Sequence, residues 1–169
     1  MSNKLQFFKL VNKGNVWSFI LLFLRHPLNV IPMFLATYQT VKISDKYYGY
    51  LHHKNNAANA FRHALWNFLI AKKCSKWRRN TRKAIKFAEK ITDWHEEFSP
   101  NTPLEKEMDL HNNHIGRKMF IISEELPLDL LLERLKEKTE ESKKIYRVED
   151  LKKYNNDLVY IEDIDLDAI

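Results

Sequence analysis

Apolar side chains recur along this chain at intervals of three and four residues, the spacing that places them on one face of an α-helix. The pattern is interrupted by residues that begin helices, such as Asn56, Thr102 and Pro127. Glycine is rare, at 3 residues in 169, which favours long helices with few tight turns. The helices expected from this pattern cover residues 4–13, 16–25, 28–47, 55–75, 81–98, 102–123 and 128–144.

The last part of the chain departs from this pattern. Residues 148–154 suit a short helical turn, and residues 158–161 are β-branched and aromatic enough for a strand or an extended clip. We therefore predict an all-α, single-domain bundle of about six to seven helices with a short extended or helical C-terminal clip. Within the single domain 1–169, residues 1–44 form apolar N-terminal helices, 45–123 a core that carries the motifs, and 124–169 a helix with an acidic tail.

One face of the helix expected over 55–75 is polar beside an apolar stripe. Asn59, His63 and Asn67 follow one another at intervals of four residues and therefore share a face. Arg62 and Trp66 border that face. Because this face adjoins the apolar stripe, we expect Arg62 and His63 at the edge of the core.

The helix expected over 102–123 carries a second polar cluster. Asn112 falls on its apolar stripe, Asp109 and Asn113 lie in the neighbouring row, and Arg117 lies further round. Gly116 shares the row of Asp109 and Asn113. Glycine inside a helix costs about 1 kcal/mol relative to alanine, so Gly116 indicates the close approach of a second helix.

A third helix, over 81–98, directs His95 toward the same interior, with Glu96 beside it. Buried polar groups without partners are costly. Polar residues that converge from three helices therefore form either a lined site or a network whose members satisfy one another.

The first interpretation is a water-using hydrolase that acts on an anionic substrate. His63 would be the general base and Asp109 would orient it or act as a ligand. Cys74 lies at the far end of its helix, so water would serve as the nucleophile. The residues expected to bind substrate are Asn59, Arg62, Trp66, His95, Asn112, Asn113 and Arg117.

The second interpretation is a non-enzymatic module in which Arg62, paired with Asp109, joins the amides and His63 in a structural network. His63, His95, His111 and Asp109 would suit zinc or iron, but no tight ligand motif such as H-E-x-x-H is present. We therefore assign no metal ligand and leave the cofactor unknown. The single Cys74 excludes an internal disulfide framework and a cysteine zinc cluster.

The runs N-A-F-R-H-A-L-W and M-D-L-H-N-N-H-I-G-R resemble those of an uncharacterised bacterial helical domain family with R-H-A-x-W and D-x-x-N-N-x-x-G-R motifs. The resemblance covers roughly residues 45–120. It implies shared site residues and no particular reaction. The matching positions are Asn59, Arg62, His63, Ala64, Trp66, Asp109, Asn112, Asn113, Gly116 and Arg117.

Charge is distributed unevenly along the chain. Residues 1–90 hold 17 Lys or Arg against 2 acids, a net charge of +15, whereas residues 91–169 carry a net charge of −9. Most residues from Lys72 to Lys83 are basic, with Trp77 among them. Such a surface suits an anionic partner, namely a phospholipid surface, nucleic acid or a phosphorylated ligand, unless the two halves neutralise each other. The oligomeric state is not predicted.

Neither apolar N-terminal segment is expected to cross a membrane. Residues 16–24 and 30–36 are each shorter than the roughly 20 apolar residues that a span requires, and Arg25, His26 and Pro27 separate them. No secretory cleavage site follows the first segment. We expect a cytoplasmic protein. We expect the two apolar segments to be buried under the rest of the fold. An uncovered N-terminal helix would instead add peripheral attachment at the inner face of the membrane.

Overall fold

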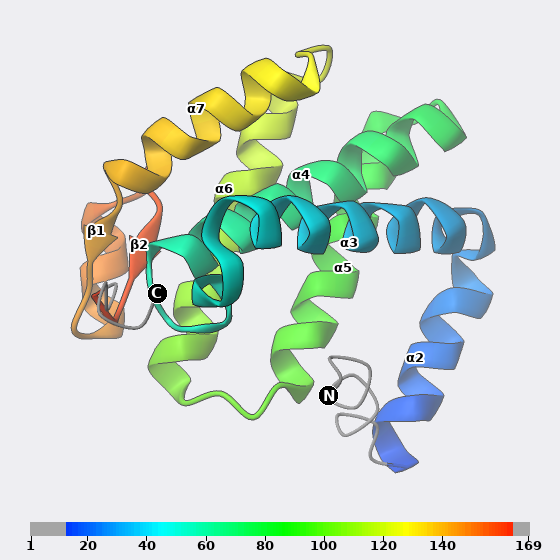
Figure 1. Cartoon of the computed structure of the whole chain (residues 1–169). Coiled ribbons are helices and arrows are strands. Elements are labelled where there is room, and N and C mark those ends of the chain that lie inside the picture. The colour runs from blue at the N-terminus through cyan, green and yellow to red at the C-terminus, as the bar shows by residue number, and fades with distance from the viewer. Residues whose placement is uncertain (1–12, 164–169) are drawn as a thin grey trace.

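The computed structural model describes residues 13–163, so the helix expected over 4–13 and the end of the acidic tail lie outside the described residues. The expectation of an all-α bundle with a short extended C-terminal clip is confirmed (Figure 1). The elements are α2 (Lys13–Arg25), α3 (Pro27–Tyr48), the 3-10 helix η1 (Gly49–His53), α4 (Ala57–Arg78), α5 (Thr81–Phe98), α6 (Pro103–Ile122), α7 (Leu128–Glu140), β1 (Lys143–Lys144), the 3-10 helix η2 (Val148–Lys153) and β2 (Val159–Tyr160).

The helices that carry the motifs begin at side-chain caps. The Asn56 side chain accepts hydrogen bonds from the first backbone N–H groups of α4. Thr102 and Glu105 form a capping box at the start of α6. Both devices satisfy N–H groups that lack partners within the helix, and they fix where the motif residues lie along each axis.

Helix α4 lies at the centre of the bundle and packs against α3, α5, α6 and α7 (Figure 1). Phe61, Leu65 and Phe68 of α4 are fully buried in the main core. Gly116 of α6 lies against α4, where a Cβ atom would come within 2.1 Å of the Ala64 carbonyl oxygen. The close helix approach expected at Gly116 is therefore present.

The C-terminal clip differs in one respect from the expectation. Helix α7 ends at Glu140 and does not continue to residue 144, because Lys143 and Lys144 pair in parallel with Val159 and Tyr160. The backbone N–H of Ile161 donates to the carbonyl oxygen of Asn55, just before α4. The clip thus ties the end of the chain to the start of the central helix.

None of the helices within residues 13–163 is long and apolar enough to cross a membrane.

Candidate functional site

Three ionisable side chains, one from each of α4, α5 and α6, meet in the interior. The Nδ1 atom of His63 on α4 lies 3.4 Å from Glu96 Oε1 on α5, and its Nε2 atom lies 3.4 Å from Asp109 Oδ1 on α6. His63 is 2 % exposed and Asp109 4 %. The imidazole ring therefore lies between two buried carboxyl groups.

Asn113 is the hub of the amides around this ring. Its Oδ1 accepts hydrogen bonds from Asn67 Nδ2 at 2.6 Å and from His63 Nδ1 at 3.2 Å. Its Nδ2 donates to Glu96 Oε1 at 3.0 Å. Because a carbonyl oxygen only accepts, this arrangement places the imidazole proton on Nδ1.

Arg62 closes the cluster on its outer side. Its Nη2 donates to His63 Nε2 at 2.9 Å and to Asn59 Oδ1 at 2.6 Å, and Asn59 Nδ2 in turn donates to Asp109 Oδ1. Arg62 is half-buried, so it separates the ring from the surface. The Nε2 lone pair of His63 is therefore already occupied by the guanidinium group.

Arg117 extends the network on the far side. Its Nη1 donates to Asn67 Oδ1 at 2.8 Å, an oxygen that also accepts from the Thr92 hydroxyl. Its Nη2 lies 3.8 Å from Glu89 Oε1. Arg117 thus belongs to the same network, although the sequence placed it further round α6.

The structure separates three of the expected substrate-binding residues from this cluster. Asn112 points instead at the C-terminal clip, where its amide exchanges two hydrogen bonds, at 2.9 and 3.0 Å, with the backbone of Val159. Trp66 donates to the Thr37 hydroxyl, and the ring of His95 packs against the edge of Trp66. The contacts of Trp66 with Thr37 and His95 therefore connect α4 to α3 and α5, outside the cluster.

Other members of the cluster were not expected as site residues. Asn67 shares the helical face of Asn59 and His63, so its four-residue interval was a usable signal. Thr92 and Asn101 gave no such signal. Asn101 lies in the loop before α6, and its amide donates to Asp109 Oδ2 at 3.1 Å.

Burial changes the protonation of the ionisable groups. It lowers the pKa of His63 well below its ordinary value, and the nearby Arg62 guanidinium lowers it further. Burial also raises the pKa of Glu96 to about 8, with the charge of Asp109 adding to the effect. The pKa of Asp109 rises to about 7, again mainly through burial, although Arg62 opposes the rise. At neutral pH the cluster therefore holds a neutral imidazole, a mostly protonated Glu96 and a partly protonated Asp109.

This protonation predicts that stability falls as pH rises from 7 to 8.5. Glu96 and Asp109 have higher pKa values in the folded protein than the ordinary 4.5 and 3.8, so the folded state binds more protons in this window. Their contribution to the free energy of unfolding is complete below about pH 4. The contribution of Asp109 is lost as pH rises through about 7, and that of Glu96 as pH rises through about 8. We expect the free energy of unfolding, measured in urea, to fall by about 1 to 2 kcal/mol between pH 7 and 8.5.

Glu96→Gln should reduce this fall, because glutamine cannot release the proton. Glu97→Gln, a change at the exposed neighbour that pairs with Lys106, is the matched control and should leave the pH dependence as in the wild type. The His63 contribution changes only below pH 6.5 and does not enter this window. A wild-type stability that is flat between pH 7 and 8.5 would contradict the assignment.

The donor types of His63, Glu96 and Asp109 would suit a divalent cation, and one ligand atom from each lies within 4.8 Å of the others. Each carboxyl group lies beside a different nitrogen of the ring, so an ion would compete with the hydrogen bonds that these atoms already make. Arg62 also occupies the Nε2 side. His111, another candidate ligand, instead contacts the Asp157 carbonyl oxygen.

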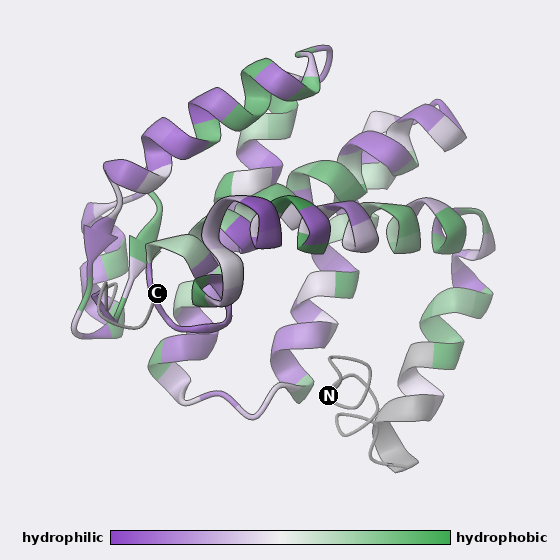
Figure 2. Ribbon diagram, in the orientation of Figure 1, coloured by the Kyte–Doolittle hydropathy of each residue, from purple (hydrophilic) through white to green (hydrophobic). Residues whose placement is uncertain are grey.

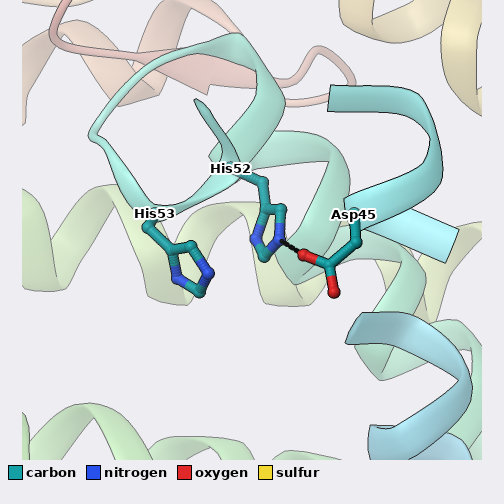
Figure 3. Close-up of side chains that lie close together, drawn as sticks. All are labelled: Asp45, His52 and His53. Carbon is teal, nitrogen blue, oxygen red and sulfur yellow. Dashed lines mark hydrogen bonds and ion pairs between the residues drawn. The ribbon is translucent and has the colours of Figure 1, made fainter. Parts of the chain in front are cut away.

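A second group of potential ligands lies at the end of α3 (Figure 3). His52 Nε2 donates to Asp45 Oδ1 at 2.8 Å, and the ring of His53 lies beside that of His52. Arg62 Nη1 is 3.4 Å from His53 Nδ1. Burial lowers the pKa of His53 to about 4, and the charges of His52 and Arg62 add to this effect. A guanidinium group this close opposes the binding of a cation, so the geometry assigns no ion to this group.

The chain matches a protein family described as a domain of unknown function (DUF6973) over residues 20–143. Neither a curated protein nor a solved structure matches the chain. The family match covers α4, α5 and α6 and most of the bundle. The expectation of an uncharacterised domain family is confirmed, whereas its bacterial origin and its motif pattern stay predictions. The chain belongs to the DUF6973 family of domains of unknown function.

Proposed function

We propose that this domain binds peripherally to an anionic phospholipid surface through α2 and α3, and that the buried polar cluster is the scaffold that holds the bundle together. The observation that carries the proposal is the apolar surface of α2 and α3. Figure 2 shows hydrophobic colouring over the second half of α2 and the first half of α3. Within residues 13–163 these helices leave many large apolar side chains exposed, which is unusual for a soluble protein unless the face meets a partner or a membrane.

The exposed apolar side chains form a row on each helix. They follow one another at intervals of three and four residues, so each row lies along one helical face. Leu24 is 71 % exposed and Trp17 68 %. The rows consist of Trp17, Leu21 and Leu24 on α2 and of Leu28, Ile31, Leu35 and Tyr38 on α3.

Charge favours lipid over a second protein as the occupant of this face. Asp45 and Glu89 are the only acidic residues among the first 90, so α2 and most of α3 carry no negative side chain. Arg25 and Lys42 flank the apolar rows. An apolar face bordered by cations and free of acids matches the boundary between acyl chains and anionic headgroups.

The sealed cluster supports the scaffold part of the proposal. Almost every polar atom of His63, Asn113 and Asp109 has a partner, and Arg62 covers the ring. A network of this kind specifies one packing of α4, α5 and α6 among several that apolar contacts alone would permit. The hydrolase interpretation stays a prediction. The closed arrangement does not favour it, because the hydrogen bond from Arg62 leaves His63 without a free lone pair for a substrate.

The experiment compares vesicle binding of the wild type with that of Leu24→Glu/Leu28→Glu. We expect the wild type to sediment with phosphatidylcholine vesicles that contain phosphatidylglycerol. The double variant should lose at least tenfold in partition coefficient, because two leucines no longer enter the apolar layer and two negative charges meet an anionic surface.

Ile121→Glu/Ile122→Glu is the matched control, since these two residues are exposed isoleucines at the end of α6. It should bind as the wild type does. Equal binding by both double variants would contradict the proposal, as would a wild type that ignores anionic vesicles. A wild-type dimer that Leu24→Glu/Leu28→Glu converts to a monomer would assign the face to a second copy instead.

A further inference from the structure

A pocket of about 280 Å³ lies where α2 meets α3, beside the end of α4 and one face of α5. This volume is slightly below the usual range for whole small-molecule sites, so it suits a single headgroup-sized ligand. Phe87 forms its apolar base, with its ring 5.4 Å from that of His26. The polar residues that line it are Arg25, His26, Arg78, Lys83, Lys86 and Lys90.

No acidic side chain lines this pocket. Among the residues that the structure describes, none of its five Lys and Arg side chains has an ion-pair partner. Lys83, Lys86 and Lys90 follow one face of α5, and Arg25 and Arg78 approach from the ends of two other helices. Cations gathered without counter-charges around a hollow create a strongly positive potential inside it.

The beginning of α3 adds to this potential. Helix α3 starts at Pro27, and no side chain caps it at His26. The N-terminal end of a helix carries partial positive charge, which favours an anion nearby. His26, the residue before this helix, lines the pocket, so the charge of the helix end adds to that of the side chains.

His26 reports the positive surroundings independently. Partial burial lowers its pKa, and the charges of Lys90, Arg78 and Arg25 lower it further. Lys83 and Lys86 of α5 also face the pocket. An anion in the pocket would offset these charges and raise the pKa of His26.

Exposed apolar residues lie next to the pocket residues in the chain. Leu24 precedes Arg25, Leu28 follows the Arg25–Pro27 corner, and Trp77 precedes Arg78 at the end of α4. Apolar residues so near a basic pocket favour a lipid over a free phosphate, because the acyl region of a lipid lies next to its headgroup.

We propose that this pocket binds the phosphate group of an anionic phospholipid headgroup, while the apolar rows of α2 and α3 enter the adjacent acyl region. The inference rests on the proposed membrane function, and it locates the headgroup at the α2–α3 corner. The sequence analysis expected an anionic partner at the basic segment Lys72–Lys83, whereas the pocket draws on only part of that segment. Arg78 and Lys83 belong to it, and Arg25, Lys86 and Lys90 do not.

The test measures partition onto phosphatidylglycerol-containing vesicles for Lys86→Gln/Lys90→Gln. The control Lys73→Gln/Lys76→Gln removes two cations of the basic run that do not line the pocket. We expect about a thirtyfold loss for the pocket variant and at most a threefold loss for the control. Lys76, Lys86 and Lys90 are exposed and Lys73 is half-buried, and none of them belongs to the core, so both variants should fold.

Equal losses in the two variants would overturn the pocket in favour of diffuse charge. Wild-type binding by Lys86→Gln/Lys90→Gln, with binding lost in Leu24→Glu/Leu28→Glu, would overturn the pocket and leave the membrane function in place.

A second measurement follows the pKa of His26 by NMR. It should rise when vesicles or dissolved glycerol 3-phosphate are added to the wild type, and should rise less in Lys86→Gln/Lys90→Gln. A rise with glycerol 3-phosphate but no vesicle binding would overturn the lipid as the source of the phosphate. DNA binding that depends on Lys86 and Lys90, without vesicle binding, would likewise overturn a lipid headgroup as the ligand of the pocket.

Discussion

The Asn113→Leu variant is expected to lose about 3 to 6 kcal/mol of unfolding free energy. Leucine has the same branching as asparagine but offers no polar atom. It would leave His63 Nδ1, Asn67 Nδ2 and Glu96 Oε1 without the partner that Asn113 provides. Each buried group that loses its hydrogen bond costs about 1 to 3 kcal/mol. Urea unfolding followed by circular dichroism measures the difference directly.

Asn101→Leu provides the matched comparison, because it makes the same substitution at the border of the network. Asn101 is half-buried and gives up one hydrogen bond, to Asp109 Oδ2, so about 1 kcal/mol is expected there. If the two variants lose equal stability, Asn113 is not the hub and the scaffold part of the proposed function fails.

The Gly116→Ala variant is expected to be less stable than the wild type by about 1 to 2 kcal/mol. The new methyl group would meet the Ala64 backbone, with its carbonyl oxygen 2.1 Å away and its carbonyl carbon 2.8 Å away. Because both partners are helix backbones, α4 and α6 must move apart, and overpacking of this kind costs about 1 to 3 kcal/mol or more. The better helix propensity of alanine returns about 1 kcal/mol of this.

Thermal and urea unfolding of Gly49→Ala separate the steric effect from the backbone effect. Gly49 has a φ of +53°, and no atom lies within 4 Å of the position that a Cβ atom would take there. Alanine at this position therefore costs only the strain of the backbone conformation. A Gly116→Ala protein as stable as the wild type would mean that the two helices are not in contact at this point.

The separation of α4 from α6 also affects the buried cluster. His63 is next to Ala64 on α4, and Asn113 lies about one turn before Gly116 on α6, so a shift between the helices stretches the bonds across this interface. The Gly116 contact and the Asn113 hydrogen bonds therefore couple, and the double variant should lose less than the sum of the two single losses.

Some parts of the site could be predicted because they depend on neighbouring residues in the chain. The intervals between Asn59, His63 and Asn67 place them on one face of any helix that contains them. Thr102 and Glu105 satisfy the first N–H groups of α6 locally, so its start was recognisable. Gly116 indicated a close contact because a glycine within a helix has a local cost.

Other parts depend on how the helices are turned toward one another. Asn112 lies on the apolar face as predicted, yet it bonds to Val159, 47 residues later, and not to the cluster. Glu96 enters the cluster beside Asp109, while the neighbouring His95 turns toward Trp66. If α5 were rotated about its axis by the angle of one residue, His95 and Glu96 would exchange places. The spacing of residues along one helix does not determine that rotation.

The same distinction applies to the surface. By itself the sequence determined that the first half of the chain is basic and that α2 and α3 are apolar, because composition and periodicity are properties of the chain alone. Only the tertiary structure decided that Arg25, Arg78 and Lys90 meet around one pocket and that, within residues 13–163, Leu24 and Leu28 stay exposed. The physical reason is that packing buries each helix on one side and leaves the rest exposed, and that choice depends on all the helices together.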